Sequence, residues 1–250
     1  MSWKNELENT KKIFRTGTKK QKLEYIWDYY KWHILVTVLV LCFIRQTLYT
    51  NTTAKTYVLQ GVFLNNTADS DDIYELENDF LQKFPIDSSK EAVFFDSSLF
   101  YIPSGNNEVA VSSYETIQVL MARMSAGDVD FMLGDTSTLI EFAYNQYFYD
   151  LSDVLSDEQY KKYEPYFLYF DKELVELLNN SDPLDYEKVS FPDPSKPELM
   201  QEPVQIMIDI TLADKISKIY PYSSNDYSMA FVIDGINSEK AIEFLEYLIS

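Results

Sequence analysis

The stretch SAGDVDFMLGD, residues 125–135, contains a step from a helix to a buried strand, and the fold can be built outward from it. Apolar residues at helical spacing predict a helix over 113–125. These residues are Ile117, Leu120, Met121 and Met124. Gly127 is the residue type that commonly follows a helix end. The apolar run after it predicts a buried strand over 128–134, and a further helix is expected over 137–145.

On both sides of this stretch, short β-rich runs alternate with helical patterns, which is typical of an α/β domain. Strands are predicted at 57–63, 91–96, 204–210 and 229–233, with a short candidate at 109–111. Helices are predicted at 69–84, 212–219 and 238–250, with two short helical turns within 150–160. Five prolines within 181–203 predict a long loop.

The N-terminal part of the chain has a different composition. Its apolar run ILVTVLVLCFI, residues 34–44, is shorter than the roughly 20 residues that a membrane-spanning helix needs. Aromatic residues that favour membrane interfaces flank the run, namely Trp27, Tyr29, Tyr30, Trp32 and Tyr49. We therefore predict one uncleaved transmembrane helix over 32–49. The alternative is a signal peptide cut near Ala54, but the region before the run is long for that and no clear cleavage motif follows.

Charge is distributed unevenly around this predicted helix. Residues 1–33 contain eight basic and four acidic residues, whereas the chain after Arg45 contains 12 basic and 36 acidic ones. The positive-inside bias predicts a basic cytoplasmic segment over 1–31, a polar stalk over 50–56 and an extracellular α/β domain over 57–250. The lipid bilayer is thus an expected partner, and the acidic charge of the external part argues against nucleic acid.

Few residues in the external part suit catalysis or metal binding. His33 and Cys42 are the only histidine and cysteine of the chain, and both lie in or beside the predicted membrane helix. No disulfide can form within the chain, and histidine chemistry is excluded from the domain. The chain matches no phosphate loop, dinucleotide-binding glycine run, nucleophile elbow or zinc helix. We expect a protein that is not an enzyme and uses no cofactor, although carboxylate pairs suited to glycoside hydrolysis stay open.

Several segments resemble bacterial extracellular solute-binding proteins. Residues 125–135 resemble their helix, Gly-Asp and hydrophobic-strand step, and 142–155, FAYNQYFYDLSDVL, resemble their next helix and turn. Residues 203–211 and 229–248 resemble later elements in the same order. Residues 22–33, KLEYIWDYYKWH, followed by an apolar run, resemble the start of uncharacterised membrane-anchored proteins of clostridia-like Gram-positive bacteria.

The resemblance implies a type 2 periplasmic-binding fold over 57–250. That family usually has two complete lobes, and because this part of the chain is shorter, the fold is expected to be a reduced form. The resemblance also implies a membrane-tethered module that captures a small solute, such as a sugar or a peptide. The alternative is an interaction or structural protein of the cell envelope that binds no small ligand and contacts another envelope protein.

Two sets of residues are candidates for ligand binding. Asp128 and Asp130, with Asp135 beyond, belong to a strand and its end, where carboxylates can hold a metal or a ligand hydroxyl. Tyr144, Tyr147 and Tyr149 lie in a segment dense in aromatic rings, which suit sugar rings and peptide side chains. The alternative interpretation is structural, with the acids at a helix end, at a strand start and as a cap, and the rings packed in the core.

Overall fold

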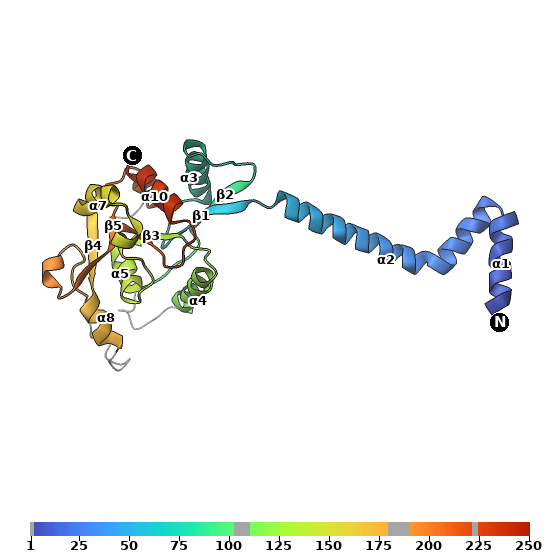
Figure 1. The fold of residues 1–250 in the computed structure, drawn as a ribbon, viewed down its shortest axis with the longest axis horizontal. Coiled ribbons are helices and arrows are strands. Elements are labelled where there is room, and N and C mark those ends of the chain that lie inside the picture. The colour runs from blue at the N-terminus through green and yellow to red at the C-terminus, as the bar shows by residue number, and fades with distance from the viewer. Residues whose placement is uncertain (1–2, 103–110, 180–190, 222–224) are drawn as a thin grey trace. The chain divides into compact units, whose positions relative to one another are not determined.

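The computed structural model describes residues 3–102, 111–179, 191–221 and 225–250, and its chain divides into two compact units after Ala54. The first unit contains helices α1 (Trp3–Thr16) and α2 (Lys19–Thr53), drawn in blue in Figure 1. Within α2, Lys19–Thr50 is long and apolar enough to cross a membrane, and it includes the predicted span over 32–49.

Helix α2 begins and ends with clear local signals. Thr18 caps its start, because the Thr18 hydroxyl accepts from the Gln21 amide while the Gln21 side chain accepts from the Thr18 amide. At the other end, the hydroxyl of Thr53 donates to the carbonyl of Tyr49 at 2.7 Å, one turn earlier. The predicted stalk over 50–56 is therefore helical through Thr53.

The second unit contains a six-stranded mixed sheet in the order β2-β1-β3-β6-β5-β4. The strands are β1 (Thr56–Phe63), β2 (Glu91–Asp96), β3 (Phe131–Asp135), β4 (Phe167–Asp171), β5 (Pro203–Asp209) and β6 (Tyr227–Phe231). Strand β1 pairs in parallel with β2 and β3, whereas the other pairs are antiparallel. The predicted α/β class is thus confirmed.

Helices cover both faces of the sheet (Figure 1). They are α3 (Ser70–Lys83), α4 (Val111–Ser125), α5 (Thr136–Tyr144), α6 (Leu151–Val154), α7 (Asp157–Tyr163), α8 (Lys172–Asn179), α9 (Ile216–Ile219) and α10 (Ser238–Ile249), with 3-10 turns η1 (Glu164–Tyr166) and η3 (Pro197–Leu199). Alternate residues of a strand point to opposite faces, so Phe131 and Leu133 join one core while Met132 joins the other. Helices α3, α9 and α10 cover the first core, and α4, α5 and α8 cover the second.

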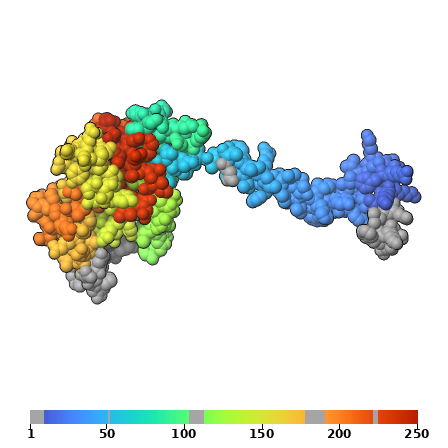
Figure 2. All heavy atoms as spheres, in the orientation of Figure 1, coloured from blue at the N-terminus to red at the C-terminus, as the bar shows by residue number. Residues whose placement is uncertain are grey.

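The first core is built largely from aromatic rings. Phe244 of α10 stacks on Phe131 with ring centroids 4.9 Å apart, and it lies 4.7 Å from Phe95 of β2. Gly61 of β1 makes room for this cluster, because a Cβ at that position would overlap the ring of Phe131. Figure 2 shows the red surface of α10 between the surfaces of α3 and α7.

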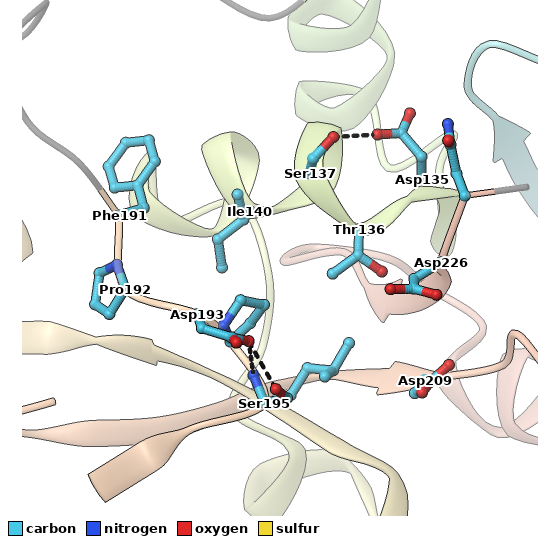
Figure 3. A pocket seen from close by; sticks show the side chains of 13 residues that line it. Asp135, Thr136, Ser137, Ile140, Phe191, Pro192, Asp193, Ser195, Asp209 and Asp226 are labelled. Carbon is cyan, nitrogen blue, oxygen red and sulfur yellow. Dashed lines mark hydrogen bonds between the residues drawn. The ribbon is translucent and has the colours of Figure 1, made fainter. Parts of the chain in front are cut away.

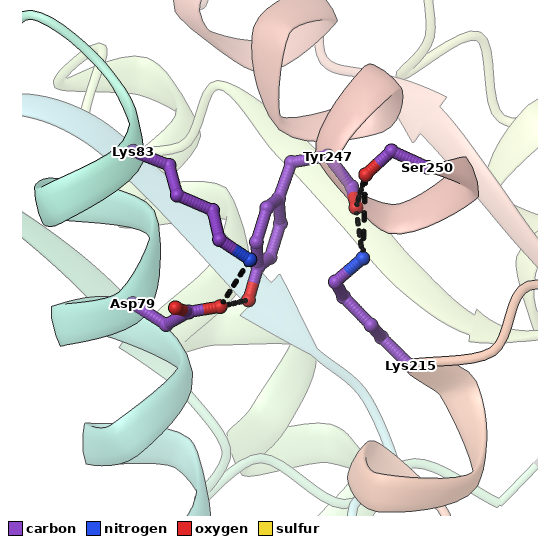
Figure 4. A network of polar contacts seen from close by, with 5 residues as sticks. All are labelled: Asp79, Lys83, Lys215, Tyr247 and Ser250. Atoms are coloured by element: carbon purple, nitrogen blue, oxygen red, sulfur yellow. Dashed lines mark hydrogen bonds and ion pairs between the residues drawn. The ribbon is translucent and has the colours of Figure 1, made fainter.

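A polar network holds the end of α10 over the first core (Figure 4). The Tyr247 hydroxyl donates to Asp79 Oδ2 of α3 at 2.6 Å, and Lys83 Nζ donates to the same oxygen at 3.0 Å. Lys215, just before α9, donates to the Tyr247 carbonyl at 2.6 Å and to the Ser250 hydroxyl at 3.4 Å. The three helices over this face are therefore joined by charge-assisted hydrogen bonds at one place.

The structure differs from the sequence predictions in several elements. Only Ile216–Ile219 of the predicted helix 212–219 is an α-helix, since Thr211 and Ala213 form turns by bonding back to Asp209 and Ile210. The strand predicted over 128–134 begins only at Phe131. The candidate strand 109–111 lies outside the described residues except for Val111, which begins α4.

Two elements escaped the sequence analysis, namely β4 and α8. Strand β4 is a short edge strand that follows a tyrosine-rich segment. It was not predicted because the aromatic residues of this region show no clear alternation of apolar and polar positions. Of the predicted loop over 181–203, residues 181–190 lie outside the described residues, and the remainder contains η3 and the first residue of β5.

Candidate functional site

The carboxyl ends of β1, β3 and β5 lie at one edge of the sheet, because these three strands run in the same direction. In open α/β sheets, this edge is where ligands usually bind. Asp135 ends β3, Asp209 ends β5, and Asp226 comes directly before β6, which starts at the same edge. These three carboxylates line a pocket of about 690 Å³ (Figure 3). This volume lies within the range of small-molecule sites.

The pocket has an apolar end and an acidic end. Figure 3 shows Phe191 and Pro192 at one end, and Asp135, Asp209 and Asp226 at the other. The remaining lining residues come from α5, β4, the loop after Pro192 and the residue before Asp226, and are Thr136, Ser137, Ile140, Leu168, Asp193, Pro194, Ser195 and Asn225. An amphipathic solute could place its apolar part on the ring and its polar groups on the acids.

Asp135 connects the end of β3 to the start of α5. Its Oδ1 accepts from the Thr138 amide at 2.9 Å and from the Ser137 hydroxyl at 2.6 Å. Its Oδ2 accepts from the Thr138 hydroxyl at 2.7 Å and from Asn65 Nδ2 at 3.4 Å. With only 8 % of the residue exposed, Asp135 is a helix cap that shapes the pocket wall.

Asp193 forms a tight local cluster on the pocket floor. It accepts from the Ser195 hydroxyl at 2.7 Å, from the Ser195 amide at 3.0 Å and from Lys196 Nζ at 2.6 Å. The Lys196 ammonium, followed by the Ser195 donors, lowers the pKa of Asp193 to about 2. Asp193 therefore carries its charge at every physiological pH, and Lys196 balances that charge.

Asp209 and Asp226 contribute charge that no lysine or arginine of the lining balances, since the described lining contains neither residue type. Asp209 is half-buried, and its Oδ1 accepts from the Thr211 amide at 2.9 Å. The exposed Asp226 is held by its backbone carbonyl, which accepts from the Thr136 amide at 2.9 Å. The Thr136 hydroxyl is buried beside them without a hydrogen-bond partner among the described residues. This end of the pocket suits a solute that donates hydrogen bonds, through hydroxyl or ammonium groups.

The other two aspartates of the sequence prediction lie far from this pocket. Asp128 and Asp130 precede β3, whereas Asp135 ends it, so about 17 Å of extended chain separates Asp130 from Asp135. Asp130 is 1 % exposed and accepts from the amides of Gln60 at 2.7 Å and Asn237 at 2.8 Å. The side chain of Asp128 is exposed to solvent. Among the described residues, no group of three or more acidic, histidine or cysteine side chains is placed to hold a metal.

The three candidate tyrosines do not form one binding surface. Tyr144 is buried and stacks on Phe191 at 4.2 Å, so it supports the apolar end of the pocket from behind. Tyr147 is half-buried and lines a separate hollow of about 90 Å³. Tyr149 packs against the first core, and its hydroxyl accepts from the Asp234 amide at 3.3 Å. Of the three, only Tyr144 lies next to the pocket.

Of the residues that line the pocket, the sequence analysis named only Asp135, and the aromatic and acidic residues that it missed are Phe191, Asp193, Asp209 and Asp226. Asp209 could have been found from the sequence, because it lies near the carboxyl end of the predicted strand 204–210. Asp135 has the equivalent position, directly after the strand predicted over 128–134. The other three lie in loops, and no spacing in the chain connects them.

Comparison of the chain with protein-family models, with curated proteins and with solved structures gives no match. The assignment of the site therefore rests on the geometry and chemistry of the described residues.

Proposed function

We propose that this protein is a membrane-tethered binding module whose pocket at the carboxyl edge of β3 and β5 captures a small solute, such as a sugar or a short peptide. The observation that carries the proposal is the pocket itself, with a stacked aromatic pair at one end and unbalanced carboxylates at the other. A sugar offers hydroxyl donors and an apolar ring face, and a peptide offers an ammonium group and apolar side chains.

We further propose that the second unit is a reduced relative of the type 2 periplasmic-binding fold. The step from α4 through Gly127 to β3, which carries the resemblance, places Gly127 at φ +74°, a backbone conformation that favours glycine. The described residues of this unit form one sheet with helices on both faces. We interpret this arrangement as the equivalent of a single lobe. A single lobe would hold a solute in an open pocket.

We also propose that α2 anchors this module in the cell envelope. We propose that α2 crosses the membrane with the N-terminus in the cytoplasm, because basic residues concentrate before the apolar run. In a Cys42→Ser background, Ser125→Cys should react with an impermeant maleimide on intact cells. Thr16→Cys should react only after the membrane is permeabilised. The reverse pattern would contradict this orientation.

Solute capture is tested by melting the full chain in detergent with a panel of neutral sugars, amino sugars and short peptides. A solute at a hundred times its Kd stabilises a protein by about 2.7 kcal/mol. For a unit of this length, that stabilisation corresponds to a rise in Tm of about 5–10 °C. We expect one class of solute to give such a rise.

A matched pair of variants separates the pocket from general acidity. The double variant Asp209→Asn and Asp226→Asn should lose most of the rise, whereas Asp128→Asn, an exposed acid outside the pocket, should keep it. If no solute in the panel raises Tm, capture is contradicted and the envelope-interaction alternative is favoured.

A further inference from the structure

Helices α1 and α2 form a hairpin in the first unit. Gly17 and Thr18 connect them, and the Gly17 amide donates to the carbonyl of Ile13 at 2.9 Å, which ends α1. Because Thr18 caps α2 immediately afterwards, two residues reverse the direction of the chain.

Side chains hold the hairpin closed. The hydroxyls of Thr10 and Tyr25 are 2.7 Å apart in a hydrogen bond. Phe14 meets the ring of Tyr25 edge-on, with the centroids 5.9 Å apart, and Tyr25 stacks on Tyr29 at 4.8 Å. Residues 10–14 of α1 therefore lie beside Tyr25 of α2.

The hairpin gathers positive charge. Residues 11–22 contain six basic residues and no acidic one, namely Lys11, Lys12, Arg15, Lys19, Lys20 and Lys22. All six are at least partly exposed. Among the described side chains of this unit, their one ion pair joins Lys20 to Glu24 at 3.9 Å, where both groups are largely in solvent. These cations are therefore almost entirely available to an external partner.

The fold of the hairpin brings this charge toward the membrane interface. Tyr25 lies only two residues before Trp27, the first ring of the interfacial aromatic group, or about 3 Å along the helix axis. Lys11 and Lys12 directly follow Thr10, whose hydroxyl bonds to that of Tyr25, so the hairpin folds these two cations back alongside the turn of α2 that precedes the group. In a continuous helix, Lys11 would lie about 24 Å away from Trp27.

We propose that the α1–α2 hairpin binds the headgroups of anionic phospholipids in the membrane leaflet nearest to it. The charges are complementary, and groups of four to eight basic residues beside a transmembrane helix are attracted to such lipids. The proposal rests on the anchor described above and is independent of the solute pocket.

The test reconstitutes the full chain in nanodiscs of phosphatidylcholine, alone or with one third phosphatidylglycerol, and follows amide hydrogen exchange over 11–16. Docking on a charged surface stabilises α1, so exchange should slow at least about tenfold with phosphatidylglycerol. About 1 M salt should abolish this difference, because it shortens the Debye length to about 3 Å.

Three variants make the test specific. Replacing Lys11, Lys12 and Arg15 by Gln should remove the effect of phosphatidylglycerol. The matched control replaces three exposed lysines of the second unit by Gln and should leave the effect intact; these are Lys90, Lys161 and Lys218. The double variant Phe14→Ala and Tyr25→Ala keeps all six charges but opens the hairpin, so it should also lose the effect.

Equal exchange in the two lipid mixtures, or an effect that survives in the Gln variant, would overturn the proposal. A chain that fails to enter nanodiscs would instead contradict the anchor itself. Because the two failures look different, each of them is informative.

Discussion

Asp130 provides the sharpest test of the distinction between a structural carboxylate and a binding one. It lies in the turn before β3, is 1 % exposed, and accepts hydrogen bonds from the backbone amides of Gln60 and Asn237. It also faces the side-chain amide of Asn237 at 3.2 Å. This single carboxylate therefore links β1, the start of β3 and the segment before α10.

Replacing Asp130 by Ala removes the acceptor and leaves two backbone donors without partners. Each buried unsatisfied donor costs about 1–3 kcal/mol, and hydrogen bonds to a charged acceptor are at the strong end of their range. We expect a loss of about 3–4 kcal/mol in the free energy of unfolding. For a unit of this length, Tm should fall by about 6–15 °C.

The assay is thermal unfolding of the full chain in detergent, followed by circular dichroism. Asp130→Asn should lose less than Asp130→Ala, because its carbonyl oxygen can still accept from one of the two amides. Asp128→Ala, an exposed aspartate two residues earlier, should change stability by less than about 0.5 kcal/mol. If Asp130→Ala is as stable as the original chain, the structural role is refuted and a binding role is open again.

Three further predictions follow from the packing. Tyr144→Ala should cost about 3–5 kcal/mol in denaturant unfolding because the ring is buried against Phe191, whereas Tyr147→Ala should cost clearly less; equal losses would contradict the different burial of the two rings. Gly61→Ala should cost about 1–3 kcal/mol by the same measurement, since the added methyl group meets the ring of Phe131, and an unchanged stability would show that the core yields there. The Tyr247 hydroxyl, followed by Lys83, lowers the pKa of Asp79 below its ordinary 3.8. A lowered pKa stabilises the fold above the ordinary value, and this contribution is lost as pH falls through the lowered pKa. The stability difference between the original chain and Asp79→Asn should therefore be largest at neutral pH and shrink in acid, and a difference that is constant with pH would contradict the network.

Much of the fold is predictable from local pattern. The helix from Ser70 to Lys83, the strand from Glu91 to Asp96 and the closing helix up to Ile249 were expected from apolar spacing and from caps. Strand β4 was not, because an edge strand of five residues carries no alternation long enough to read. The start of the predicted helix 212–219 was wrong for another reason. Leu212 is 89 % exposed, so no tertiary packing stabilises a helix at that position.

The sequence alone determined the apolar segment of α2, the charge asymmetry around it and the α/β class, because these depend on composition and on the spacing of neighbouring residues. Only the tertiary structure brought the residues of the site together. Strand order brings Asp135, Asp209 and Asp226 to one edge from three distant parts of the chain, while the length of β3 places Asp130 at the opposite edge. Such proximity depends on which strands pair, and no local pattern encodes that choice.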